Sequence, residues 1–210
     1  MGPVGLKWSD MRISAALLVL ASLLSGGAVS LAAAEEPLSP AAANPSATRD
    51  DAATLDKLFA ELKRQRNDKA AERIAGRIWT EWFKSGSATV DLLMKWAGDA
   101  IDKKKYDAAL DFLDQVTVLA PNYAEGWNRR ATVHYLMKNY AKSMADIEKT
   151  LELEPRHFGA LSGMAAILKD SGRKQLALDA YQRVLAIYPM MRNAQNEVAT
   201  LSEELAGEGI

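Results

Sequence analysis

Three prolines in the second half of the chain recur at one fixed interval. Pro121, Pro155 and Pro189 lie 34 residues apart, twice in succession. Other positions repeat with the same spacing, in the columns Leu93, Trp127 and Leu161; Ala97, Ala131 and Ala165; Ala109, Ser143 and Ala177; Leu113, Ile147 and Tyr181; and Val116, Thr150 and Val184. A fixed period of this length predicts a stack of similar structural units, each packed on its neighbours, rather than one irregular core.

Each unit contains two stretches with the apolar spacing of an amphipathic helix. Leu110, Leu113 and Val116, for example, recur every three residues, which places them on one face of a helix. Proline has no amide hydrogen to donate and disfavours helical angles in the residue before it. The three prolines are therefore predicted to separate consecutive helix pairs. The polar turns within the pairs are predicted at 102–105, 138–139 and 170–173.

The stretch "WNRRATVHYLMKNYAKSMADIEKTLELEP", residues 127–155, resembles the tetratricopeptide repeat (TPR) in its large apolar, small, small, apolar and proline positions. The resemblance implies an all-α fold, a right-handed solenoid of helix-turn-helix units with a C-terminal capping helix. It divides a TPR domain at 52–210 into a degenerate repeat at 56–89, repeats at 90–123, 124–157 and 158–191, and a capping helix at 192–206.

The chain departs from the repeat pattern at a few positions. In the degenerate repeat, Ser87 stands in the proline column and Lys63 in the first small column, although Leu62 fits the frame. Arg130 occupies a column that usually holds leucine in the family. Two interpretations of Arg130 stay open: partial burial against a carboxylate, or a guanidinium that reaches solvent along its own aliphatic stem.

Residues 1–34 have the features of a secretory signal peptide. Basic Lys7 and Arg12 precede the apolar run Ile13–Leu24, and small residues ending at Ala34 follow it. This order is typical of a cleaved signal, and the run is shorter than the ~20 apolar residues that span a bilayer. Cleavage is predicted near Ala34. The alternative is an uncleaved N-terminal anchor in the inner membrane.

The segment between this signal and the first repeat is rich in proline and alanine. Residues 35–51 contain three of the seven prolines, and such a segment buries too little apolar surface to offset its ordering entropy. It is predicted to be a disordered linker. The true start of translation, Met1 or Met11, is left open.

Charge and composition exclude several classes of function. The net charge is −1 and the chain has no cysteine, which argues against nucleic-acid binding and excludes thiolate chemistry. The two histidines, His134 and His157, have no histidine or cysteine companion. His134 is predicted to pack in the core and His157 to lie exposed between two repeats. The chain is therefore predicted to be non-enzymatic, without a cofactor or metal.

Aromatic residues gather near the start of the predicted repeats. Trp79, Trp82 and Phe83 lie three and four residues apart, so they share one helix face. They are predicted to seal the amino-terminal end of the core rather than to form a ligand site.

The resemblance to TPR proteins implies a concave groove lined by the first helix of each unit. The matching positions are Asp91, Met94, Gly98, Ile101 and Asp102; Glu125, Asn128, Thr132, Tyr135 and Leu136; and Gly159, Ser162, Ala166, Lys169 and Asp170. Chaperone-binding TPR domains clamp a partner's terminal carboxylate with lysine and asparagine at fixed columns. Here only Asn128 resembles that pattern, so binding of chaperone tails is not supported.

These features favour a periplasmic adaptor or scaffold that binds a protein or peptide partner in the groove, in cell-envelope assembly or maintenance. The alternative is a membrane-anchored or self-associating structural subunit of a larger envelope or secretion complex. Homo-oligomerisation stays open. The identity of the partner does not follow from the sequence.

Overall fold

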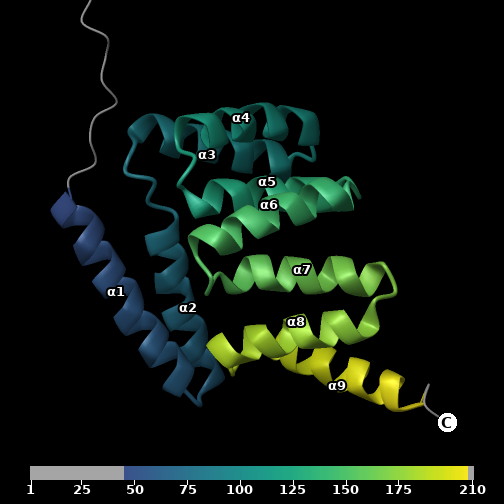
Figure 1. Ribbon diagram of the computed structural model, residues 1–210. Helices are drawn as coiled ribbons and strands as arrows, with labels where there is room; N and C mark the ends of the chain where they lie inside the picture. The colour runs from purple at the N-terminus through teal and green to yellow at the C-terminus, as the bar shows by residue number, and fades with distance from the viewer. Residues whose placement is uncertain (1–44, 208–210) are drawn as a thin grey trace, which may run out of the picture. The chain divides into compact units, whose positions relative to one another are not determined.

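The computed structural model of the chain describes residues 45–207, and side chains from residue 52 onward. This part consists of helices joined by short turns (Figure 1). The helices are α1 (Pro45–Arg64), α2 (Asp68–Trp82), α3 (Ala88–Asp102), α4 (Tyr106–Leu119), α5 (Ala124–Leu136), α6 (Tyr140–Leu153), α7 (Phe158–Asp170), α8 (Lys174–Ile187) and α9 (Arg192–Gly207). The predicted signal peptide and residues 35–44 of the predicted linker lie outside the described residues.

The last part of the predicted linker is helical. Residues 45–51 form the first turns of α1, which begins at Pro45. Proline is favoured at the first position of a helix because its fixed φ suits the helix and its missing amide hydrogen is not needed there. The proline content that indicated a linker is thus compatible with a helix start at this point.

Helices α3 to α8 form three stacked pairs (Figure 1). Pro121, Pro155 and Pro189 each lie two residues beyond the end of the second helix of a pair, where a proline was predicted to separate units. The turns within the pairs also repeat, because Lys104, Lys138 and Gly172 all have positive φ, at 55°, 60° and 73°. A left-handed residue at this position ends a helix and lets the chain reverse.

The small columns lie where the two helices of each pair meet. Ala97, Ala131 and Ala165 are at most 2 % exposed, and so are the residues of the second small column. In the middle pair the Ser143 hydroxyl donates to the Ala131 carbonyl oxygen over 2.8 Å. A larger side chain at either position would push the helices apart, which explains the periodic alanines.

Helix α9 covers the carboxyl-terminal end of the stack. Ala194 and Leu201 are buried, and Val198 and Leu205 pack against the same cluster. These residues form the buried face of the capping helix predicted at 192–206, which shields the core of α7 and α8.

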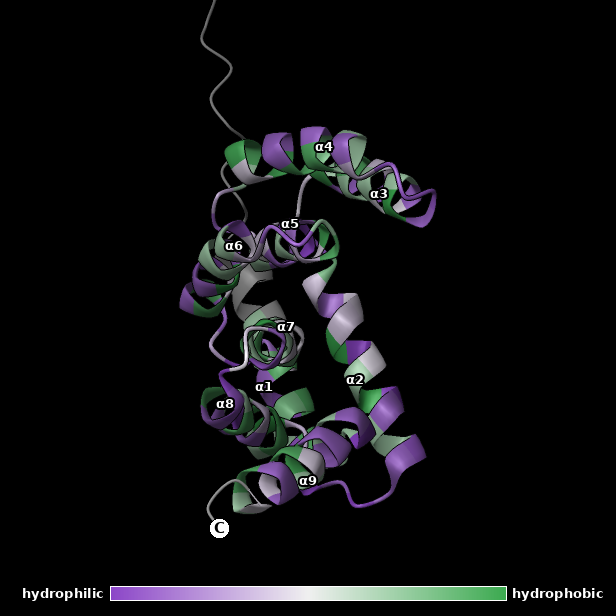
Figure 2. Cartoon of the chain, turned by 90° about the vertical axis from the view of Figure 1, so that its right-hand side faces the viewer, coloured by the Kyte–Doolittle hydropathy of each residue, from purple (hydrophilic) through white to green (hydrophobic). Residues whose placement is uncertain are grey.

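The amino-terminal hairpin of α1 and α2 does not continue the stack. Helix α2 runs across the other helices (Figure 1) and lies on the side formed by α5 and α7, opposite α6 and α8 (Figure 2). Phe59, Ile78 and Trp82 share one core cluster with Phe158 of α7 and Tyr181 of α8. Among the described residues, the core of α3 and α4 includes none from α1 or α2. The degenerate repeat thus has its two helices but packs against the third repeat.

The prediction that the aromatic cluster seals the amino-terminal end of the core is therefore wrong. Trp79 and Trp82 pack edge-on and tilted against Phe158, with ring centroids 5.6 and 4.9 Å away. The spacing correctly placed the tryptophans on one helix face. It carried no information on which repeat that face would cover.

Candidate functional site

The predicted groove residues divide into an exposed and a covered set. On α3, Asp91 and Asp102 are exposed, whereas Met94 is buried in the core of that pair. Glu125 and Asn128 are buried and are discussed next. The remaining predicted positions are exposed or half-buried: Gly98, Ile101, Thr132, Tyr135, Leu136, Ser162, Ala166, Lys169 and Asp170.

Two predicted groove residues, Glu125 and Asn128, lie inside the protein. Glu125 is 2 % exposed, and its carboxylate accepts a hydrogen bond from Asn128 Nδ2 over 2.8 Å. Arg129 Nε lies 3.5 Å from the second carboxylate oxygen. The prediction of Glu125 as a ligand-facing groove residue is thus wrong, because its carboxylate is buried and is satisfied by these neighbours. Asn128 is also buried, but it lines the cavity described below.

The prediction that His157 is exposed is also wrong. Its side chain is fully buried and its Nδ1 accepts the Ala160 amide over 3.1 Å, so it caps the start of α7. Because Nδ1 is the acceptor, the proton lies on Nε2, which faces Glu125 at 3.2 Å. Its position next to Pro155 pointed to a loop, and the sequence contained no signal that Trp82 would cover it.

Trp79 fills the groove at the start of α7. A Cβ atom built on Gly159 would lie 2.8 Å from Cη2 of Trp79, so the indole rests directly on the backbone at this predicted groove position. Helix α2 therefore occupies the groove at the start of the third repeat.

The rest of the groove contains a cavity of about 140 Å³ between α5, α6 and α7. Its lining is made of mostly small residues: Asn128, Ala131, Thr132, Tyr135, Ser143, Ile147, Gly159, Ala160 and Gly163. Small-molecule sites usually measure about 300 Å³ or more. The cavity is thus suited to a single side chain of a larger ligand.

Tyrosine and aspartate side chains form the far rim of this groove. The hydroxyls of Tyr135 and Tyr140 donate to Asp170 Oδ2 over 3.2 and 2.9 Å. Burial, together with the Asp170 charge, raises the pKa of Tyr135, and the hydrogen bond to Asp170 raises the pKa of Tyr140. Both hydroxyls therefore stay protonated and orient the Asp170 carboxylate.

The charge of Lys169 is also used within the fold. Its Nζ lies 2.6 Å from Glu197 of α9, and this hydrogen bond raises the pKa of Lys169. A ligand carboxylate would have to compete with Glu197 for this lysine.

Arg130 follows the first of its two open interpretations. Its guanidinium binds Asp146 through two hydrogen bonds of 2.8 and 2.7 Å and Asp114 through a third of 2.8 Å. The hydrogen bond to Asp146 raises the pKa of Arg130 further. Arg130 therefore links the second repeat to α4 of the first and lies away from the groove.

His134, in contrast, packs in the core as predicted, with 7 % of its surface exposed. In the part of the chain with described side chains, no group of three or more histidine or acidic residues could hold a metal ion. Within the same residues, none of the helices combines the length and the hydropathy that crossing a membrane requires.

The fold consists of stacked helix pairs that repeat every 34 residues. This architecture defines the class of helical-repeat proteins. A family model described as "Tetratricopeptide repeat" matches residues 124–157. The chain is 52 % identical over 202 residues to a TPR repeat-containing protein of Rhizobium etli, covering 95 % of this chain and 98 % of the relative. The chain belongs to the TPR repeat-containing proteins, whose solenoids form extended concave surfaces for binding.

Solved structures with the same fold agree with this assignment. The first TPR of Spaghetti (RPAP3), bound to an HSP90 peptide, has a TM-score of 0.55 at 24 % identity and covers 57 % of this chain and 95 % of its own. The TPR2B domain of yeast Sti1, in a complex with pHsp70, has a TM-score of 0.53 at 16 % identity, covering 56 % and 99 %. At such identities the likeness shows the fold, and the predicted all-α solenoid is confirmed.

A more distant relative shares only the repeats. The chain is 28 % identical over 117 residues to the small glutamine-rich tetratricopeptide repeat-containing protein 2 of Saccharomyces cerevisiae. This match covers 56 % of the chain and 34 % of that protein.

Proposed function

We propose that this protein is a non-enzymatic adaptor that binds a peptide segment of a partner protein in the open part of its groove. The cavity between α5 and α7 is the main support, because it would accept one side chain of the partner while Thr132 and Tyr135 contact the backbone. Two structurally similar TPR domains are described in complex with an HSP90 peptide and with pHsp70. The peptide-binding mode of this fold is thus the best precedent.

The charges of the groove favour a neutral or basic partner segment. Asp91 and Asp102 are exposed on α3 and Asp170 on α7, whereas Lys169 is paired with Glu197. Asn128, the one residue that matched the carboxylate-clamp pattern, donates its amide to Glu125. A terminal carboxylate would find little to bind it in this groove, so we propose a ligand other than an acidic chaperone tail.

A photo-crosslinking amino acid at position 132 tests this function. Thr132 is exposed and lines the cavity, so a probe there should capture the partner. Glu148 is also exposed but lies on α6, and a probe at that position serves as the matched control. Capture of the same protein with equal yield from both positions would exclude the groove.

A substitution at the same position supplies the second arm. Thr132→Arg should abolish capture by filling the cavity, with a change in melting temperature of only a few degrees because the side chain is exposed. Asn128 is unsuitable for this purpose, since its loss would remove one of the hydrogen-bond donors of the buried Glu125 carboxylate. Undiminished capture by Thr132→Arg would contradict the proposal.

The proposed location is the periplasm, with a role in cell-envelope assembly or maintenance. The support comes from the sequence of residues 1–34. Amino-terminal sequencing of the mature protein tests it: a start at or near Glu35 fits a cleaved signal. A start at Met1 or Met11 would favour the alternative, a protein anchored by its amino terminus within a larger envelope or secretion complex.

A further inference from the structure

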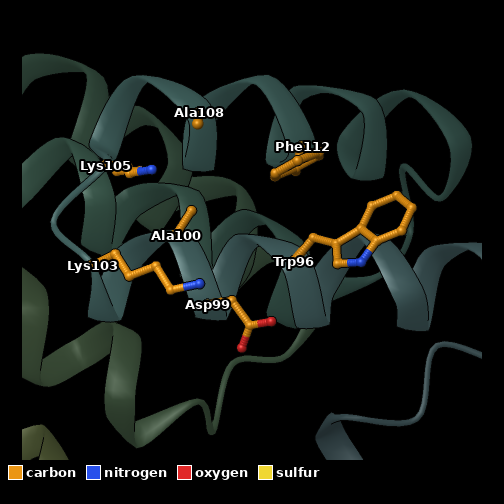
Figure 3. A pocket seen from close by; sticks show the side chains of 7 residues that line it. All are labelled: Trp96, Asp99, Ala100, Lys103, Lys105, Ala108 and Phe112. Carbon is orange, nitrogen blue, oxygen red and sulfur yellow. The ribbon is translucent and has the colours of Figure 1, made fainter.

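The outer face of α3 and α4, at the end of the repeat stack, exposes several large apolar side chains. Leu92 and Trp96 are each 44 % exposed and Leu119 is 58 % exposed. The rings of Trp96 and Phe112 lie 5.6 Å apart and flank an open depression of about 440 Å³ (Figure 3). Terminal repeats of solenoids generally need a polar outer face for solubility.

The equivalent positions of the second repeat show what normally packs on this face. Trp96 and Phe112 stand at the repeat positions that Arg130 and Asp146 occupy in the second repeat, 34 residues further along the chain. In the second repeat that pair is covered by α4 of the repeat before it, through Asp114 at 2.8 Å and Thr117 at 3.0 Å from Arg130. The Trp96–Phe112 pair is therefore a repeat-to-repeat contact surface without its covering helix.

The third repeat follows the same rule. Met164 and Ala180 occupy these columns there. Met164 shares an apolar cluster with Leu151 of α6 in the preceding repeat, and Ala180 is 3 % exposed. Helix α2 would be the covering helix for the first repeat, but its apolar face packs on α7 and α8.

Charged residues of both signs border the apolar part of this face. Asp99, Lys103 and Lys105 line the same depression (Figure 3). A surface that carries an apolar centre and both charges is complementary to a second copy of itself, because in a two-fold contact each aspartate can face a lysine of the other copy.

We propose that two copies of this chain associate through the α3–α4 face, defined by Leu92, Trp96, Asp99, Lys103, Lys105 and Phe112. The contact is isologous and closed. A head-to-tail contact is disfavoured since the opposite end of the stack is α9, whose exposed face carries the polar residues Asn196, Thr200 and Glu203. The dimer leaves the cavity between α5 and α7 open, so this inference stands independently of the proposed ligand.

Sedimentation velocity of the purified chain over a range of concentrations tests the dimer. The wild type should reach twice the mass of one chain, and Trp96→Glu should raise the dissociation constant about thirtyfold or more, as loss of an aromatic anchor does. Val118→Glu is the matched control, because Val118 is 79 % exposed on the same helix pair but lies about 120° around α4 from Phe112. A wild type of single-chain mass at every concentration, or equal dissociation by Val118→Glu, would overturn the proposal.

A charge exchange keeps the test valid if Trp96→Glu fails to fold. Asp99→Lys alone and the pair Lys103→Asp with Lys105→Asp should each weaken self-association, while a mixture of the two proteins should form a one-to-one heterodimer. Failure of the mixture to associate more tightly than either protein alone would contradict the two-fold contact. It would then point to a different partner on this face.

The lack of cysteine in the chain allows an independent measurement. A thiol introduced by Leu92→Cys should be alkylated more slowly as the protein concentration rises, whereas the thiol of Val118→Cys should react at a constant rate. Equal concentration dependence at both positions would be evidence against the proposed face.

Discussion

The indole of Trp82 lies parallel to the imidazole of His157, with 4.0 Å between ring centroids and 10° between ring planes. This contact joins the amino-terminal hairpin to the start of α7. His157 in turn faces Glu125 of α5 at 3.2 Å, so three helices that are distant in sequence meet at one buried cluster. The hairpin is therefore a wall of the groove and not a separate appendage.

Truncation of Trp82 tests how strongly this wall is held. Trp82→Ala should lower the free energy of unfolding by about 3–5 kcal/mol, the usual cost of removing a buried aromatic side chain. Leu176→Ala, at a site that is 50 % exposed, should cost less than about 1 kcal/mol. Denaturant unfolding measures both, and hydrogen exchange should show the largest loss of protection in α1 and α2. A Trp82→Ala variant as stable as Leu176→Ala would contradict the described packing.

Two glycines of α7 should respond in opposite directions to alanine. At Gly159 the new Cβ would lie 2.8 Å from Cη2 of Trp79, which is itself held by His157 and Phe158. Gly159→Ala should therefore destabilise the protein by about 1–3 kcal/mol. At Gly163 the nearest atom is 3.4 Å away, so Gly163→Ala should stabilise the helix by about 0.5–1 kcal/mol. Thermal unfolding measures both variants. A stabilisation by Gly159→Ala as well as by Gly163→Ala would contradict the contact between Trp79 and Gly159.

The ion pair of Arg130 and Asp146 should be replaceable as a pair but not singly. Asp146 is 5 % exposed, so Arg130→Met leaves a buried carboxylate without its partner and should cost about 3–5 kcal/mol. The double variant Arg130→Met with Asp146→Ala has the same residues as the third repeat, Met164 and Ala180. It should regain most of the lost free energy of unfolding. A double-mutant cycle of unfolding free energies measures this coupling, and simple additivity would contradict it.

Protonation of His134 should lower stability in acid. Burial lowers the pKa of His134 from its usual 6.5. The charges of Lys142 and Arg130 also lower this pKa, whereas the charge of Asp146 raises it. As the pH falls, His134 therefore binds a proton in the unfolded chain at a higher pH than in the folded chain. Its contribution to the free energy of unfolding is fully present above pH 6.5 and is lost as the pH falls through the folded pKa. His134→Phe removes this term. Melting temperatures between pH 7.5 and 5 should therefore fall less steeply in the variant than in the wild type, and parallel curves would contradict the shift.

Much of the architecture could be predicted from the sequence because it depends on local periodicity. The columns of Ala97 and Ala109 specify where two helices meet, and the proline column specifies where each pair ends. The spacing of Ala194, Val198 and Leu201 is likewise that of an amphipathic helix with one buried face. Each of these features concerns contacts between neighbours in the chain, and the repeated pattern states them several times.

The candidate site was predicted less well, because it depends on which surfaces distant in sequence cover one another. The family pattern predicted Thr132, Tyr135 and Asp170 at the groove, and all three are exposed or half-buried. It also predicted Glu125 and Gly159 there, yet Glu125 is buried next to His157, and Trp79 of α2 lies on Gly159. Nothing in the columns distinguishes an exposed groove position from one that another part of the same chain occupies.

The sequence by itself determined the helices, their pairing and the order of the stack, since an amphipathic pattern states which face of a helix must be buried. Only the tertiary structure decided what buries the face of α2 that carries Trp79 and Trp82. That face packs against α7, where Gly159 leaves room for one indole and His157 offers a parallel ring to the other. The choice follows from shape complementarity between side chains about 75 residues apart, and it leaves Trp96 exposed at the other end of the stack.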